Sequence, residues 1–104
     1  MRFSVEISKN AQRDLTGIYN YIAFELRSPE NAAAQLERIE KAVLSLDYMP
    51  ERFRRYDREP WNARNLRIMP VDKFLVFYIP DTVKGKVIVT RVMYSGRNID
   101  AQLK

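Results

Sequence analysis

Three residues near the C-terminal end of the sequence have side chains that could support chemistry on RNA. Arg91, Tyr94 and Arg97 follow one another at intervals of three. Adjacent guanidinium groups favour the phenolate form of a tyrosine. The tyrosine, or a carboxylate, could then take a proton from a ribose 2′-hydroxyl while arginines stabilise charge on the phosphate. The alternative is structural, with Tyr94 as a half-buried strand residue and Arg91 as a surface ion-pair residue.

A second group of candidates combines arginines with aromatic rings. The arginines are Arg52, Arg54, Arg55, Arg58, Arg64 and Arg67, and the rings between them are Phe53, Tyr56 and Trp61. Basic side chains neutralise phosphates, and aromatic rings stack on unpaired bases, so the pattern indicates binding of RNA or another polyanion. Planar guanidinium groups bind carboxylates equally well, which makes an acidic partner segment a second possibility. A third is a solvated basic loop whose rings close the core.

Two residue types are missing, and their absence narrows the possible reactions. The 104-residue chain contains no cysteine and no histidine. Without cysteine there is no disulfide framework, thiolate nucleophile or zinc finger. Without histidine there is no imidazole base, Ser-His triad or histidine-ligated metal. The sequence also lacks a Gly-rich phosphate loop and acids at metal-ligand spacing, so we expect no cofactor and no metal.

The positive charge of the chain is concentrated in its C-terminal half. Residues 1–49 hold six basic and seven acidic residues, whereas residues 50–104 hold twelve and six, so the halves contribute −1 and +6 to the total of +5. Such asymmetry points to a polyanion or an acidic protein meeting the C-terminal half. The alternative is that the charge serves only solubility.

Length and N-terminal pattern predict one domain, residues 1–104, in the cytoplasm. Domains most often have roughly 100–150 residues. The N-terminus has no continuous apolar segment of the kind found in signal peptides. The longest apolar run, residues 74–79, is far shorter than the ~20 residues that span a bilayer, so we expect no contact with a membrane.

The N-terminal half predicts a strand followed by two helices. Alternation over residues 2–7 is typical of a half-buried strand, and Ser8 can cap the next helix. The apolar stripe of that helix is Ala11, Leu15, Ile18, Ile22 and Leu26. Gly17 interrupts it at a cost of about 1 kcal/mol relative to alanine, a cost that is tolerable if a second helix must approach closely there. Ser28 and Pro29 begin the second helix, Pro50 ends it, and the short connection predicts an antiparallel hairpin.

The C-terminal half predicts strands. Residues 51–63 have neither helical nor strand periodicity and are expected to form a loop. Strands follow around 66–68, 74–79 and Lys86–Tyr94, with a short helix at 98–103. The sequence therefore predicts an α+β fold: an N-terminal strand, an antiparallel helix hairpin and a three-stranded antiparallel meander, with the helices on one face of a mainly antiparallel sheet.

The strand at 74–79 is apolar on both faces. Phe74, Val76 and Tyr78 point to one side, and Leu75, Phe77 and Ile79 point to the other. Two helices cover only one face, so we expect a partner protein to cover the second. In the last strand, simple alternation places Arg91 on the same face as Val87, Val89 and Met93, where an arginine needs an anion.

Four segments of the sequence together carry a family resemblance. They are FSVEISKNAQRDLTGIYNYI, SPENAAAQLERIEKAVLSLDYMPERF, LRIMPVDKFLVFYIPD and VIVTRVMYSGRN. In this order, and over nearly the whole length, they resemble the RelE/ParE superfamily of toxins from bacterial type II toxin–antitoxin modules, also called plasmid stabilisation proteins. The first contains the family's D-L-x-x-I-x-x-Y-I core, and the last corresponds to its final strand and basic end.

The resemblance implies positions for an active site. The nuclease members place active groups where this chain has Arg67, Arg91 and Tyr94, with Arg97 in support. The chain departs from the family at residues 95–98, which are SGRN where the family often has Gly-Arg-Arg-Asp or His-Arg-Arg-Asp. It also lacks the histidine of some ribonuclease members and the paired lysines of others.

The resemblance further implies an antitoxin partner and a toxin–antitoxin hetero-oligomer. We expect an acidic, partly disordered C-terminal antitoxin segment that folds as it binds. It would cover the apolar sheet face or a helix groove through Phe74, Val76, Tyr78 and Trp61, and offer acids to the arginine cluster.

The target is left open by the sequence. The superfamily contains ribosome-dependent mRNA endonucleases and gyrase-poisoning members that are not enzymes, and the helix DLTGIYNYI looks closer to the ParE branch. We therefore expect a growth-arresting toxin that acts by mRNA cleavage on the ribosome or by inhibition of DNA gyrase. A plain nucleic-acid-binding module is the remaining alternative.

Overall fold

The computed structural model describes residues 2–96 and 99–103. The N-terminal elements are strand β1 (Ser4–Ile7), helix α1 (Lys9–Asn20), π-helical turn η1 (Tyr21–Glu25), helix α2 (Pro29–Leu44) and 3₁₀ turns η2 (Ser45–Asp47) and η3 (Pro50–Arg52). The remaining elements are strands β2 (Arg67–Val71), β3 (Phe74–Asp81) and β4 (Lys86–Tyr94) and helix α3 (Ile99–Leu103). No helix in the described part of the chain is long and apolar enough to span a membrane.

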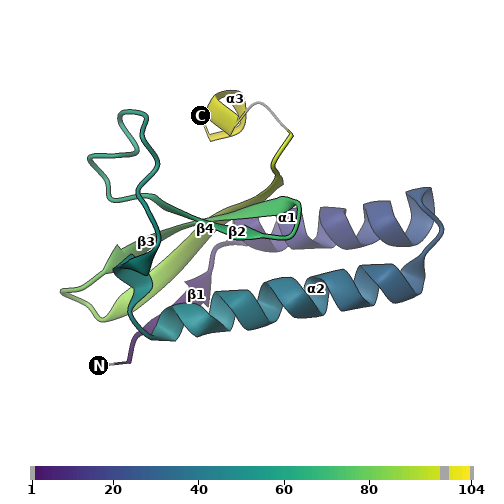
Figure 1. Ribbon diagram of the computed structural model, residues 1–104, viewed down its shortest axis with the longest axis horizontal. Coiled ribbons are helices and arrows are strands. Elements are labelled where there is room, and N and C mark those ends of the chain that lie inside the picture. The colour runs from purple at the N-terminus through teal and green to yellow at the C-terminus, as the bar shows by residue number, and fades with distance from the viewer. Residues whose placement is uncertain (1, 97–98, 104) are drawn as a thin grey trace.

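The predicted fold class is confirmed. The sheet has the strand order β1-β4-β3-β2, in which β1 is parallel to β4 and the other neighbours are antiparallel. Helices α1 and α2 lie side by side on one face of the sheet, and α3 lies on the opposite side (Figure 1). Because β1 pairs with β4, the first and the last strand of the chain lie next to each other in the sheet.

Local sequence signals explain where the first helix starts and how it ends. The Ser8 hydroxyl accepts a hydrogen bond from the amide of Ala11 at 3.1 Å, as expected for an N-cap. Beyond Asn20 the helix widens into η1, where the amide of Leu26 donates to the carbonyl of Tyr21 at 3.0 Å. The expected apolar stripe does not stay buried to its end, because Leu26 is exposed.

Gly17 does not lie at a close approach of a second helix, so the condition that would make its cost tolerable is not met. Among the described residues, no atom outside its immediate helix surroundings lies within 4 Å of a Cβ built on this glycine. The residue itself is exposed. The helix therefore has open space beside Gly17 rather than a packed neighbour.

The main core lies between the helix hairpin and the sheet. Ile39 and Val43 of α2 pack against Val76, Tyr78 and other buried strand residues. The Tyr78 ring is fully buried, and its hydroxyl donates to the carbonyl of Pro50 at 2.6 Å. This bond ties the start of η3 to the central strand, so it fixes where the following loop leaves the core.

The far face of the sheet is covered by the chain itself, contrary to our expectation of a partner protein. Phe77 lies in a second buried cluster with Tyr56, Leu66, Ile68 and Met93. Tyr56 packs edge-on against Phe77, with ring centroids 6.0 Å apart. Trp61 of the loop and Ile99 and Leu103 of α3 complete the cover. The loop and the C-terminal helix therefore cover part of the apolar surface for which a partner was predicted, while Ile88 on the same face stays exposed.

A bulge in β4 changes the faces expected from simple alternation. Phe77 pairs with Arg91, but Tyr78 pairs with Val89, so Thr90 is the extra residue. Beyond Thr90 the faces are exchanged, and Arg91 lies on the far face rather than beside Val89. Simple alternation predicts Arg91 and Val89 on one face, because the apolar pattern of the sequence does not reveal a bulge.

Replacing the core tyrosine should alter stability at alkaline pH. Burial raises the pKa of Tyr78 to about 12 from an ordinary value of 10, although the nearby Arg67 and Arg52 act in the opposite direction. The unfolded tyrosine loses its proton near pH 10 and the folded one near 12, so the free energy of unfolding should fall over this interval, by up to about 2–3 kcal/mol. In Tyr78→Phe this part of the decline should disappear.

Urea unfolding at pH 9 and pH 11.5 measures this effect. At pH 9 Tyr78→Phe should cost about 1–2 kcal/mol because the Pro50 carbonyl loses its donor. Tyr48→Phe, at an exposed tyrosine, is the control and should keep the alkaline decline of the unmodified chain. Equal alkaline declines in Tyr78→Phe and the unmodified chain would contradict the assignment.

Candidate functional site

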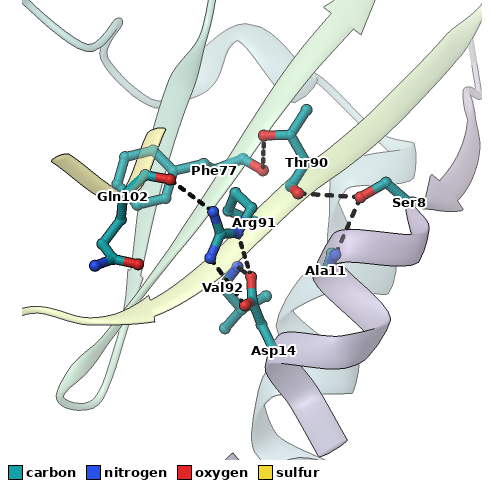
Figure 2. A network of polar contacts seen from close by, with 8 residues as sticks. All are labelled: Ser8, Ala11, Asp14, Phe77, Thr90, Arg91, Val92 and Gln102. Atoms are coloured by element: carbon teal, nitrogen blue, oxygen red, sulfur yellow. Dashed lines mark hydrogen bonds and ion pairs between the residues drawn. The ribbon is translucent and has the colours of Figure 1, made fainter. Parts of the chain in front are cut away.

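Arg91 is held in a bidentate ion pair with Asp14 of α1. The guanidinium Nε lies 2.7 Å from Asp14 Oδ2 and Nη2 lies 3.1 Å from Oδ1, while Nη1 donates to the carbonyl of Gln102 at 2.7 Å (Figure 2). The two charged side chains are only 22% and 17% exposed. The Asp14 carboxylate raises the pKa of Arg91 above its usual value. Arg91 therefore connects β4 with α1 and α3.

The Asp14 carboxylate also binds the backbone of β4, at the point where β1 ends and no longer pairs with it. The Ser8 amide donates to Val89 at 2.9 Å and its hydroxyl to the carbonyl of Thr90 at 3.0 Å. Next along β4, the amide of Val92 donates to Asp14 Oδ2 at 2.9 Å. Beyond the end of β1, Ser8 and Asp14 thus bind the backbone groups of β4 that have no strand beside them. These bonds hold the start of α1 against the edge of β4 (Figure 2).

Arg67 begins β2 and holds the preceding loop in place. Its Nη1 donates to the carbonyls of Phe53 at 2.7 Å and Glu51 at 2.9 Å, and its Nε donates to Asn65 Oδ1 at 3.1 Å. Nη2 lies 3.3 Å from the Glu51 carboxylate, and only 11% of the arginine side chain is exposed. Arg67 is therefore engaged with groups of its own chain through all three nitrogens of the guanidinium.

The strand register separates the three residues for which RNA chemistry was expected. Arg67 lies on the helix-covered face opposite Tyr78, whereas Arg91 lies on the far face of β4. Tyr94 pairs with Phe74, four residues along β3 from Tyr78, which corresponds to roughly 13 Å. The structure thus places the three in different surroundings.

The basic cluster divides into structural and exposed arginines. The Arg52 guanidinium donates to the carbonyls of Ser45, Tyr48 and Met49, the shortest at 2.6 Å to Tyr48. It therefore caps the C-terminal end of the second helix. Arg52 is nevertheless exposed, as are Arg54, Arg55, Arg58 and Arg64, whereas Arg67 is half-buried. Arg64 lies over the Trp61 ring at 5.2 Å. Arg97, the last of the predicted target-binding residues, lies outside the described residues.

A groove of about 1040 Å³ lies between the helix hairpin and one end of the sheet. Its apolar lining includes Ile18, Ile22 and Leu26 on the α1–η1 side and Phe74 and Tyr94 on the sheet. Of the four residues predicted to contact a partner, Phe74 lies in this groove, Trp61 lies on the far face, and Val76 and Tyr78 are fully buried. Only Phe74 therefore offers surface inside the groove.

Exposed apolar side chains lie in this groove and next to it in the sequence. Tyr21 and Leu26, which line it, are 57% and 56% exposed, and the neighbouring Phe24 is 71% exposed. Tyr94 across the groove is 47% exposed and packs edge-on against Phe74. Sequence reasoning counted Leu26 as core, because a regular helix continues its apolar stripe and the widening at η1 gives no pattern of its own.

The charges around the groove leave a positive rim. Its two acids are paired within the chain: Asp14 with Arg91 at 2.7 Å and Asp72 with Arg38 at 2.8 Å. The Arg38 guanidinium lowers the pKa of Asp72. Arg13 and Lys73 also line the groove, and neither has an ion-pair partner within the described part of the chain. The groove thus combines an apolar floor with cations that match an acidic ligand.

Several solved structures with a similar fold come from toxin–antitoxin systems. The fold is similar to a chain of the chromosomal ParDE system from P. aeruginosa, with 19% identity and a TM-score of 0.73 over 89% of this chain and 96% of that chain. It is also similar to a chain of the RelBE2 complex from Mycobacterium tuberculosis, with 21% identity and a TM-score of 0.64 over 90% and 99%. At these identities the likeness shows the fold alone.

The sequence assigns the family. The family described as "ParE toxin of type II toxin-antitoxin system, parDE" matches residues 5–99. The chain therefore belongs to the ParE family of toxins. A comparison with curated protein sequences gives no significant match.

Removing either partner of the Asp14–Arg91 pair should destabilise the fold. Asp14→Ala and Arg91→Ala should each lower the free energy of unfolding by about 2–4 kcal/mol, because each leaves a partly buried charge unpaired. A double-mutant cycle measured by urea unfolding should give a coupling energy above about 1 kcal/mol. The exposed Glu37–Lys41 pair is the control and should couple by less than about 0.5 kcal/mol. Additive effects at Asp14 and Arg91 would contradict this role.

Proposed function

We propose that this chain arrests growth as a non-catalytic, ParE-like inhibitor that binds DNA gyrase and is neutralised by an antitoxin held in the groove. The observation that carries the proposal is the engagement of Arg67 and Arg91 with groups of their own chain. An arginine that stabilises a reacting phosphate must point its donors at that phosphate. To do so, Arg91 would have to move away from Asp14, and the carboxylate would be left unpaired in a partly buried position. The free energy lost with this ion pair would oppose stabilisation of the phosphate.

The exposed arginines of the loop support binding of an anionic target surface. Arg54, Arg55 and Arg64 are exposed on a loop whose base is fixed by Arg67 and by the Tyr78–Pro50 bond. A fixed loop presents its charges without a large loss of conformational entropy on binding. This favours a stable inhibitory complex, in which acidic protein groups or gyrase-bound DNA would meet the loop.

The groove supports neutralisation by an antitoxin. The similar structure from M. tuberculosis is described as that of a toxin–antitoxin complex. By analogy, the groove would receive an apolar, acidic antitoxin segment, since its lining is apolar and its rim carries Arg13 and Lys73. The resulting assembly would be a toxin–antitoxin hetero-oligomer.

A supercoiling assay with purified DNA gyrase tests the proposed target. The chain, made by cell-free synthesis, should inhibit supercoiling, and Arg54→Ala/Arg55→Ala should weaken inhibition at least tenfold by removing two exposed charges. The matched control, Lys9→Ala/Lys84→Ala, removes the same charge from exposed positions in α1 and in the turn after β3. It should stay within threefold of the unmodified chain.

Two results would contradict the proposal. Growth arrest without any effect on supercoiling, even at a large molar excess over gyrase, would exclude gyrase as the target. Normal growth during expression of the folded chain would remove the toxin assignment for this copy and favour a plain nucleic-acid-binding module.

A further inference from the structure

Gly17 lies in the middle of helix α1 without a structural requirement of the described chain for a glycine. The helix continues on both sides of it, so an alanine or leucine would favour the helical conformation more. No atom of the described residues outside its immediate helix surroundings lies within 4 Å of a Cβ placed there, so a side chain would not collide with the fold. The fold thus accepts a residue that weakens the helix and leaves an open space.

That space is part of the groove. Gly17 lines the groove together with Ile18 and Tyr21 on its own helix and with Ala34 on α2. Gly17 and Ala34 have small or no side chains, and Ile18, Tyr21 and Phe74 contribute apolar surface to the same groove. A large apolar side chain from a partner would fill the hole at little cost in desolvation.

We propose that Gly17 is a specificity-determining residue, whose open space in the groove admits one large apolar side chain, of leucine or aromatic size, from an acidic amphipathic helix of the antitoxin. This rests on the proposed function, because it assumes that an antitoxin segment occupies the groove. It adds the chemistry of the contact and names the residue that selects it.

Charge and shape argue for this occupant. The groove acids Asp14 and Asp72 are paired within the chain, whereas Arg13, four residues before Gly17 and therefore on the same helix face, has no ion-pair partner within the described residues. An acidic residue next to the apolar anchor would pair with Arg13. From Gly17 to Leu26 the lining extends roughly 13 Å along the helix axis, which suits two to three turns of a partner helix.

The experiment fills the hole and measures binding of the purified full-length antitoxin encoded next to the toxin gene. Gly17→Leu places a side chain in the space and should weaken binding by calorimetry at least 100-fold, with Gly17→Ala weakened about three- to tenfold. The matched control is Thr16→Leu, which adds the same side chain one residue away, outside the residues that line the groove. It should bind within threefold of the unmodified chain.

Thermal unfolding of the same variants shows whether the open space beside Gly17 is needed for stability of the fold or only for binding of the antitoxin. Gly17→Ala and Gly17→Leu should unfold at or above the temperature of the unmodified chain. If Gly17→Leu binds the antitoxin as tightly as the unmodified chain, the inference is wrong while the proposed function stands. If both Gly17 variants unfold at lower temperature, the space serves the fold and the inference is also wrong. If the unmodified chain itself does not bind, both proposals fail.

Discussion

The Asp14 carboxylate is the interaction on which the arrangement of this molecule depends. It pairs with the Arg91 guanidinium and accepts from the amide of Val92, and Arg91 in turn donates to the carbonyl of Gln102. Helix α1, strand β4 and helix α3 therefore meet at one polar centre. Because a partly buried charge is costly unless it is paired, the two side chains hold each other in place. Asp14 also lines the groove, so the same contact helps to set the position of the helix hairpin over the sheet.

Much of the fold could be predicted from periodicity and end signals, but the candidate site could not. Ser8, Pro29 and the two-faced strand at 74–79 have local signatures, and the helix hairpin and antiparallel sheet follow from them. The bulge at Thr90 and the widening at η1 insert one residue without changing composition, so the faces of the following residues were misplaced. The sequence did not predict that the chain covers the far face of its own sheet, because the buried side chains of loop 53–66 follow neither helical nor strand periodicity.

The arginines illustrate why residue type alone does not reveal a role. Arg52, Arg67 and Arg91 each donate several hydrogen bonds to backbone carbonyls or a carboxylate. By contrast, Arg54 makes one long hydrogen bond, 3.5 Å to the carbonyl of Arg55, and Arg64 lies over the Trp61 ring. Both sets lie within one basic half of the chain and have the same local composition. The difference arises from which carbonyls the turns at η2, η3 and α3 leave without partners, and this depends on tertiary structure. The net charge of +5 thus combines arginines that organise the molecule with arginines that can meet a target.

We propose that Arg67, Arg91 and Tyr94 of this ParE-family chain do not act on RNA, and mapping of mRNA 5′ ends in cells tests this proposal most directly. The chain is expressed to growth arrest, and new 5′ ends are located by primer extension relative to the reading frame. The account predicts no increase in ends at fixed positions within codons compared with cells arrested by a gyrase inhibitor. New codon-linked ends that disappear in Tyr94→Phe would contradict it, because they would show that the chain cleaves mRNA on the ribosome.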